Sequence, residues 1–103
     1  MSGRSTALLT AEELARSGAV SAAVEACYEA LALGDREPRI HALLAHLMLE
    51  GDFYDGAIAE ATKAIEMDPD CSAAYLALGL AYDRRGGMSD QSVLVWHELA
   101  EVA

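Results

Sequence analysis

The chain repeats itself with a period of between 33 and 36 residues, and this recurrence limits the possible folds more than any other feature. Gly18, Gly51 and Gly86 recur at this interval. Five or six residues after each glycine stands a small residue followed by a β-branched one: Ala23-Val24, Ala57-Ile58 and Ser92-Val93. A period of this length is typical of helical arrays in which each copy is one helix pair. The recurrence therefore predicts three helix pairs.

The composition also favours helices over strands. Hydrophobic residues make up 53% of the chain, and many of them are alanine, which has the highest helix propensity. No run of β-branched and aromatic residues alternates with polar residues between turn signals, as a half-buried strand would require. We therefore predict an all-α fold with helices near residues 5–16, 21–33, 38–50, 54–67, 71–85 and 89–102.

Glycine and proline separate the predicted helices. Each recurring glycine can end the first helix of its pair by adopting a positive φ. Pro38 and Pro69 cannot continue a preceding helix but fit the first turn of the next one, so they separate successive pairs. Polar residues suited to cap the second helices are Ser21, Asp55 and Ser89. We expect one domain over residues 1–103, with repeats at about 5–35, 37–70 and 71–103.

The clearest motif runs from Gly51 to Gly86. Its first part comprises Gly51-Asp52, Tyr54-Asp55, Ala57-Ile58, Ala61, Lys63-Ala64-Ile65 and Asp68-Pro69. Its second part, residues 74–82, carries an aromatic residue, a Leu-Gly pair and a tyrosine. This pattern resembles the tetratricopeptide repeat family, strongly over the last two thirds of the chain and less closely over the first. The resemblance implies three antiparallel helix-turn-helix repeats stacked in a short right-handed solenoid.

Arrays of this family present a concave groove lined by the first helix of each pair, and this groove is the usual binding surface. The resemblance implies that the groove is lined by Leu8, Glu12, Ala15, Arg16, His41, Ala45, Met48, Leu49, Leu76, Leu80, Asp83 and Arg84. A largely apolar groove with an adaptable methionine suits an amphipathic helix or an extended apolar peptide of a partner protein. The alternative is that Met48 and Leu49 are core residues, because such side chains at helical spacing more often serve packing.

The last predicted helix carries apolar residues on more than one face. Helical arrays normally end in a helix with a polar outer side, so Leu94, Val95 and Val102 are expected to need a cover. A homodimer, a partner protein or further repeats of a longer protein would each provide one. The alternative function is therefore a structural unit that assembles through this helix. A small chaperone that shields an aggregation-prone helix is a variant of the binding function.

The charge excludes several classes of partner. The formal net charge is −10 and the chain holds only seven Lys and Arg, whereas nucleic-acid binding requires clustered basic residues. The same charge disfavours an anionic membrane surface, and no apolar stretch approaches the roughly 18 residues of a spanning helix. The N-terminus lacks the apolar core of a signal peptide. We expect a cytoplasmic protein with a basic or neutral protein partner.

Catalytic and metal-binding patterns are missing from the sequence. Cys27 and Cys71 form neither a CxxC motif nor a disulfide framework, and we expect both to be reduced and structural. His41 and His46 are five residues apart and therefore lie on different faces of a helix. Closely spaced aspartates flank helix boundaries, where they cap backbone N–H groups. The sequence therefore predicts neither an enzyme nor a cofactor or metal site.

Overall fold

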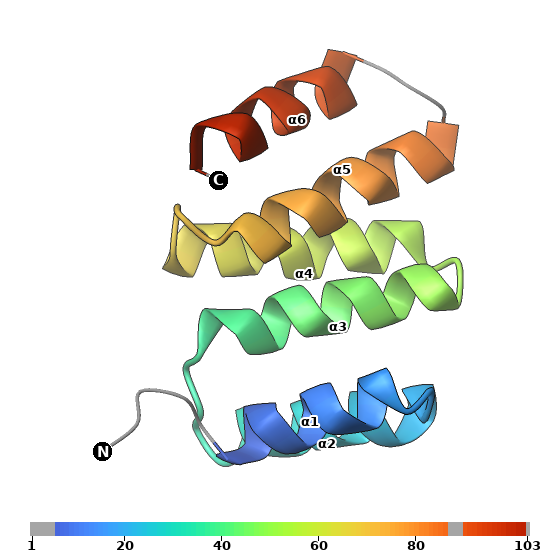
Figure 1. Ribbon diagram of the computed structural model, residues 1–103, viewed down its shortest axis with the longest axis vertical. Coiled ribbons are helices and arrows are strands. Elements are labelled where there is room, and N and C mark those ends of the chain that lie inside the picture. Colours follow the sequence, from blue (N-terminus) through green and yellow to red (C-terminus); the bar gives the residue numbers. More distant parts are fainter. Residues whose placement is uncertain (1–5, 87–89, 103) are drawn as a thin grey trace.

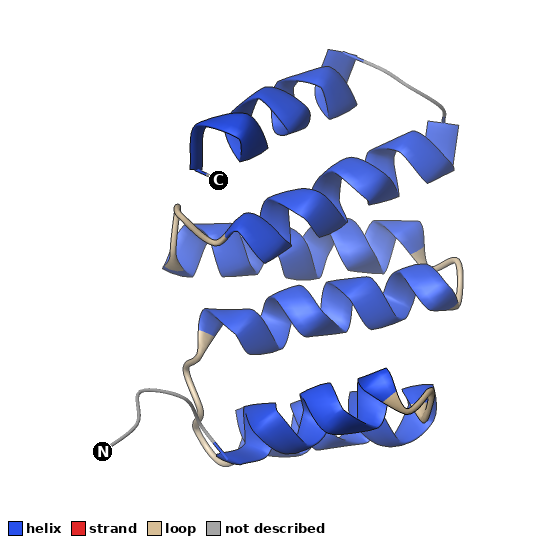
Figure 2. Ribbon diagram, in the orientation of Figure 1, coloured by secondary structure: helices blue, strands red, loops and turns tan. Residues whose placement is uncertain are grey.

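The computed structural model describes residues 6–86 and 90–102 as a set of six α-helices (Figure 1). These are α1 (Thr6–Arg16), α2 (Val20–Ala32), α3 (Pro38–Glu50), α4 (Tyr54–Met67), α5 (Ser72–Gly86) and α6 (Asp90–Val102). Within these two ranges there is no β-strand (Figure 2). The all-α class is confirmed, and each helix begins and ends within one residue of its predicted bounds.

The helices follow one another along the longest dimension of the molecule, with α1 and α2 at one end and α6 at the other (Figure 1). The three principal extents are 38, 28 and 21 Å. Each helix packs on the next helix in the sequence, and α3 also packs on α1 and α5. Among the described residues, α2 makes no contact with α4, and α4 makes none with α6. The central helix α3 therefore joins the N-terminal pair to the rest of the molecule.

The prolines lie at helix boundaries, as their chemistry requires. Pro38 is the first residue of α3, where its missing N–H would have no intrahelical partner in any case. The preceding residue, Glu37, caps this helix by accepting a hydrogen bond from the backbone N–H of Arg39 at 3.4 Å. Pro69 lies in the connection between α4 and α5 and not in the first turn of α5.

The prediction that glycines end the first helices holds in part, and two of the predicted helix caps are wrong. Gly18 has a φ of 86°, as expected of a glycine that ends a helix, but at the second turn the left-handed residue is Asp52, with a φ of 62°. The predicted caps Ser21 and Asp55 are wrong, since both lie inside their helices. The N-cap positions of α2 and α4 are held by Ala19 and Phe53, without a side-chain hydrogen bond. The predicted cap Ser89 lies outside the described residues.

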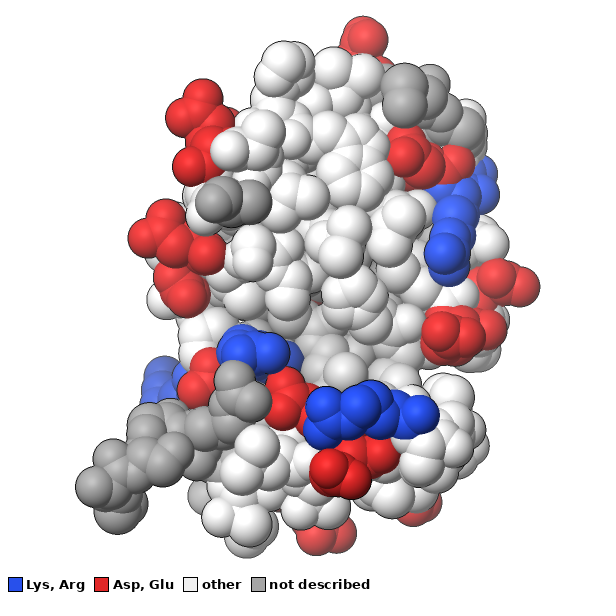
Figure 3. Space-filling model, viewed as in Figure 1, with Lys and Arg blue, Asp and Glu red and all other residues white. Residues whose placement is uncertain are grey.

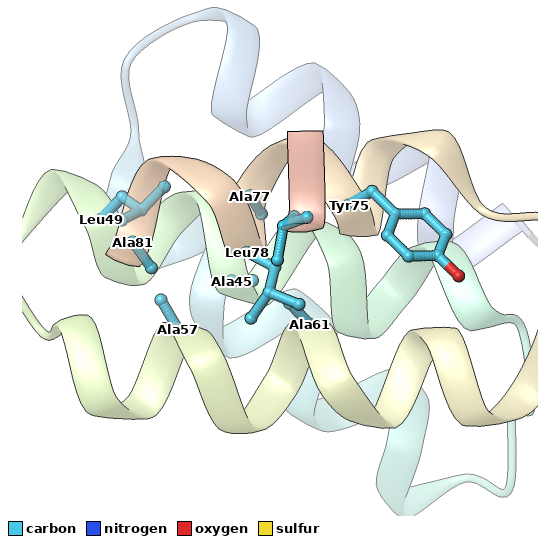
Figure 4. Packing of buried hydrophobic residues seen from close by; sticks show 9 residues of the cluster. Ala45, Leu49, Ala57, Ala61, Tyr75, Ala77, Leu78 and Ala81 are labelled. Carbon is cyan, nitrogen blue, oxygen red and sulfur yellow. The ribbon is translucent and has the colours of Figure 1, made fainter. Parts of the chain in front are cut away.

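The buried core is divided between the two halves of the molecule. One cluster joins α1, α2 and α3 and contains Leu8, Ala11, Ala23, Cys27, Ala30, Ile40, Leu44 and Leu47. The other joins α3 to α6 and contains Ala45, Leu49, Ala57, Ala61, Tyr75, Ala77, Leu78, Ala81 and Val95 (Figure 4). Alanine is frequent in both because a short side chain allows two helices to approach closely. Cys27 and Cys71 are buried and free, as predicted.

Trp96 anchors α6 on α5. Its indole Nε1 donates a hydrogen bond to the Asp83 carboxylate at 3.0 Å, and its six-membered ring lies against Gly79. A Cβ added at Gly79 would stand only 2.8 Å from the ring carbons Cη2 and Cζ2. The glycine is therefore required here by the close approach of the indole to the helix backbone.

Candidate protein-interaction surfaces

Two of the groove residues predicted on α3 face α4 and not α1 and α5. The Nδ1 atom of His41 lies 2.7 Å from the Oε1 atom of Glu60 on α4. The sulfur of Met48 lies 3.0 Å from the point where a Cβ on Gly56, also on α4, would stand. Both side chains therefore point toward α4. The prediction for this helix was displaced by one residue, which turns a side chain by about 100° around the helix axis.

The side of α3 that faces α1 and α5 is formed by residues that the sequence prediction missed. Arg39 donates to Glu12 of α1, with 3.2 Å between the guanidinium nitrogen and the carboxylate oxygen. Leu43 lines a depression of about 400 Å³ between α1 and α3, together with Glu12 and Arg16. His46 lies 3.2 Å from the carbonyl oxygen of Ala73 on α5.

Three further predicted groove residues are core residues. Leu8, Ala45 and Leu49 are buried within the two clusters. For Leu49 this agrees with the alternative of a packing role, and Leu8 and Ala45 are likewise packed inside the molecule and not exposed in a groove. Because the α-helix presents only part of its circumference to any one side, residues that pack on a neighbouring helix are unavailable to a partner.

The accessible predicted residues of α1 and α5, together with Arg39 and Leu43 of α3, define a surface on one side of the molecule. We call it the front face, and it comprises Glu12, Arg16, Arg39, Leu43, Leu76 and Leu80 of α1, α3 and α5. Leu76 and Leu80 lie three and seven residues after Ala73, which contacts α3, and so they follow one side of α5. Figure 3 shows charged residues where α1 meets α3 and an uncharged expanse over α5 and α6.

The last two predicted groove residues lie near the end of α5. Asp83 accepts the indole hydrogen bond described above and therefore faces α6, while its second oxygen, Oδ1, is buried without a hydrogen-bond partner among the described residues. Arg84 is exposed in the last turn of the helix, where positive charge complements the helix dipole. Asp83 thus serves the contact between helices, and only Arg84 is free to meet a partner.

His46 is partly buried between α3 and α5, and burial lowers the pKa of its imidazole below the usual 6.5. Its hydrogen bond to the carbonyl of Ala73 and the charge of Glu50 act in the opposite direction, and Arg84 adds to the lowering. The neutral ring therefore prevails at neutral pH, with its Nε2–H donated to the carbonyl oxygen.

We expect this histidine to make the fold sensitive to mild acid. Because its folded pKa lies below the unfolded value of about 6.5, the unfolded chain takes up a proton first as the pH falls. The stability contribution is complete above that value and is lost as the pH falls toward the folded pKa. Urea unfolding between pH 8 and pH 5 should therefore show a smaller loss for His46→Gln than for the parent protein. Parallel stability curves for the two proteins would contradict this assignment.

The nucleophilic and basic groups of the interior serve the structure. The thiol of Cys27 is fully buried, and its pKa is raised to about 11 by burial and, to a lesser extent, by the negative charge of Glu60. A thiol in this state is almost entirely protonated at neutral pH and is a poor nucleophile. The partner of Glu60 is His41, in a pair that links α3 to α4.

Metal-binding clusters and membrane-spanning helices can be assessed for the described residues only. In residues 6–86 and 90–102, no three side chains of His, Cys, Asp or Glu gather in a way that could hold a metal ion. No helix of the same residues has both the length and the apolarity needed to cross a lipid bilayer.

A second surface lies between α2 and the turn that joins α3 to α4, and the sequence prediction missed it. It is a hollow of about 990 Å³, which we call the α2–α4 hollow. Its apolar lining comes from Val20 and Val24 of α2, Leu47 and Met48 of α3, and Phe53. The hollow exists because α2 packs on α3 without reaching α4.

Carboxylates surround this hollow. Glu25, Glu50, Asp52 and Asp55 contribute to its lining, with Arg85 as the one basic residue among the lining side chains. Arg85 is bound to Asp55, with 2.8 Å between nitrogen and oxygen. Asp52 accepts a hydrogen bond from the Tyr54 hydroxyl at 3.0 Å, and this bond raises the pKa of that phenol.

The residues predicted for self-association on α6 occupy three different environments. Leu94 is 66% exposed, as expected, and the adjacent Val93 is also exposed. Val95 is only 8% exposed and belongs to the core cluster shared by α3 to α6, so its expected exposure is wrong. Val102 is partly buried against the same cluster. Val95 is buried because the contact between Trp96 and Gly79 holds α6 close to α5.

Comparisons with known proteins do not place the chain in a family. No protein-family model matches the sequence, and no curated protein has a significantly similar sequence.

Proposed function

We propose that the chain is a non-catalytic protein-interaction module built from three tetratricopeptide-like helix pairs stacked as a short right-handed solenoid. Its partner is a helix or an extended peptide of another protein, which lies along the front face. The observation that carries the proposal is the apolar side of α5, where Leu76 is exposed and Leu80 is partly exposed. Figure 3 shows an uncharged surface over α5 and α6. Accessible leucines in a row are typical of surfaces that bind proteins.

Two further observations support this proposal. The helix bounds agree with the sequence repeat, in which α1, α3 and α5 are the first helices of successive pairs. The front face also changes character along its length, from the ion pair of Glu12 and Arg39 to the leucines of α5. A polar end and an apolar end suit an amphipathic segment that lies in one orientation.

A non-catalytic role agrees with the state of the reactive side chains. Cys27 is buried with a raised pKa, and His41 is engaged with Glu60. Catalysis would require such groups to be open to a substrate and within reach of one another. Here these side chains lie between helices, where His41 pairs with Glu60 and Cys27 packs in the core.

The alternative proposal of self-assembly through α6 rests on fewer residues than the sequence indicated. Val95 is buried within the chain itself, which leaves Leu94 and its neighbour Val93 as the exposed apolar residues of α6. A patch of two side chains is small compared with the roughly 800 Å² that each partner buries in a stable interface. We therefore rank binding on the front face above assembly through α6.

The test is selection of peptides from a random display library on the immobilised protein, followed by affinity measurements with variants. We expect Leu76→Glu and Leu80→Glu to weaken the selected peptides by about ten-fold or more, because a charge would be buried against an apolar partner. The matched control is Leu33→Glu, at a residue 82% exposed just after α2. Selected peptides that bind all three variants as tightly as the parent protein would contradict the proposal.

A further inference from the structure

We infer that the α2–α4 hollow is a second docking site, separate from the front face. Its occupant is a short segment of a partner protein that carries one or two large apolar side chains flanked by lysine or arginine. The apolar side chains would enter the hollow and the basic ones would meet the carboxylates around it. This inference extends beyond the proposed function, because it concerns another surface and another class of segment.

The shape and lining of the hollow fit an apolar anchor. Val20, Val24 and Met48 approach from two helices and leave a volume of about 990 Å³, at the upper end of the roughly 300–1,000 Å³ typical of ligand sites. The hollow is bounded by helices that pack on a common neighbour, α3, and not on each other. Two of its walls are the helices α2 and α3, and the turn of Gly51, Asp52 and Phe53 forms another.

Phe53 is a second observation, independent of the hollow itself. It holds the N-cap position of α4, where a serine, threonine or aspartate would stabilise the helix by accepting a backbone hydrogen bond. The phenylalanine makes no such bond and remains 69% exposed, with its ring against Gly51. Because most of the ring is exposed to solvent, it buries little apolar surface within the chain itself. A partner that covers the ring would bury apolar surface that the isolated chain leaves in water.

The charge around the hollow selects a basic segment. Asp52 and Asp55 already interact with Tyr54 and Arg85. Glu25 and Glu50, by contrast, are exposed and form no ion pair or hydrogen bond with other described side chains. Two carboxylates with unused bonding capacity beside an apolar hollow suit the ammonium or guanidinium groups of a partner.

A second copy of this chain is a poor occupant. Its most exposed large apolar side chain within a helix is Leu94 of α6, and the same helix carries Asp90, Glu98 and Glu101. These acidic residues would approach the acidic rim of the hollow and be repelled by it. The segment that fits is therefore foreign and basic.

The experiment is fluorescence anisotropy with a labelled synthetic peptide of leucine and lysine pairs around one central phenylalanine. A control peptide keeps every lysine but replaces leucine and phenylalanine with serine. We expect the parent protein to bind the apolar peptide at least about ten-fold more tightly than the serine peptide. Phe53→Ser should weaken the apolar peptide by about ten-fold. The fold should persist, because serine can cap α4.

The contribution of the carboxylates around the hollow is tested with variants that each carry two substitutions. Glu25→Gln combined with Glu50→Gln should weaken the apolar peptide several-fold and reduce the salt dependence of its binding. The control pair, Glu29→Gln with Glu66→Gln, removes one exposed carboxylate from α2 and one from α4, neither of which lines the hollow. It should leave the affinity within about two-fold. Circular dichroism confirms that each variant is helical.

Three results would overturn the inference. One is equal affinity for the two peptides, since attraction to the net charge alone would then explain binding. Another is an equal loss with both glutamate pairs. The third is loss of binding in Leu80→Glu together with full binding in Phe53→Ser, which would place the basic peptide on the front face.

Discussion

Replacing Leu44 with alanine is expected to lower the free energy of unfolding by about 2–5 kcal/mol, the usual effect of emptying a fully buried leucine site. Leu44 is one of the largest completely buried side chains and lies in the cluster of α1, α2 and α3. Few other contacts join the N-terminal pair to the molecule, because α2 does not reach α4. Urea unfolding followed by circular dichroism measures the change.

The matched control for this experiment is Leu33→Ala, which removes the same atoms from a side chain that is 82% exposed. Its effect should remain below about 0.5 kcal/mol, as for most surface substitutions. If Leu44→Ala had an effect as small as the control, the cluster around α3 would not hold the N-terminal pair. The difference between the two variants reports on the buried contacts of Leu44, because the same atoms are removed from an exposed site in the control.

Gly79→Val is expected to lower the free energy of unfolding by about 1–3 kcal/mol through overpacking. Even the Cβ would stand 2.8 Å from the Trp96 ring. The ring cannot swing away freely, since its Nε1 is bound to Asp83. Trp96 is the one tryptophan of the chain, so its emission spectrum reports directly on this contact. The emission should shift to longer wavelength as the indole is displaced toward water.

Gly86→Val provides the control on the same helix, because nothing lies within 4 Å of a Cβ added there. It should change stability by less than about 0.5 kcal/mol and leave the tryptophan emission unaltered. An unchanged spectrum in Gly79→Val would show that the indole does not rest on this glycine. The contact between α5 and α6 would then need another explanation.

The candidate surfaces show how much of the binding surface the sequence repeat alone could predict. The groove residues predicted on α3 follow from pairing Leu44 with Gly79 as equivalent positions of successive repeats, whereas the structure makes Ala45 the core residue packed among α3 to α6. The sequence does indicate the correct pairing of repeats, since Ala23 lies twelve positions after Ala11 and Ala57 lies twelve positions after Ala45. The alignment on Leu44 breaks this spacing. It moved the predicted binding position by one residue, from His46 to Ala45.

The sequence by itself determined the all-α class and the bounds of the six helices, because these depend on local chemistry. Alanine-rich segments favour the helix, while Pro38 and Gly18 interrupt it at defined points. Neighbours a few residues away are enough to express these preferences.

Only the tertiary structure decided which side chains are free to meet a partner. A helix turns by about 100° per residue, so the direction of a side chain depends on the register in which whole helices pack. That register buried Val95 and turned Met48 toward α4. It also brought Val24 of α2 beside Glu50 and Phe53 around one hollow, although Val24 is distant from the other two in the sequence. Their proximity follows from the packing of α2 and α4 on a shared neighbour, which no local pattern encodes.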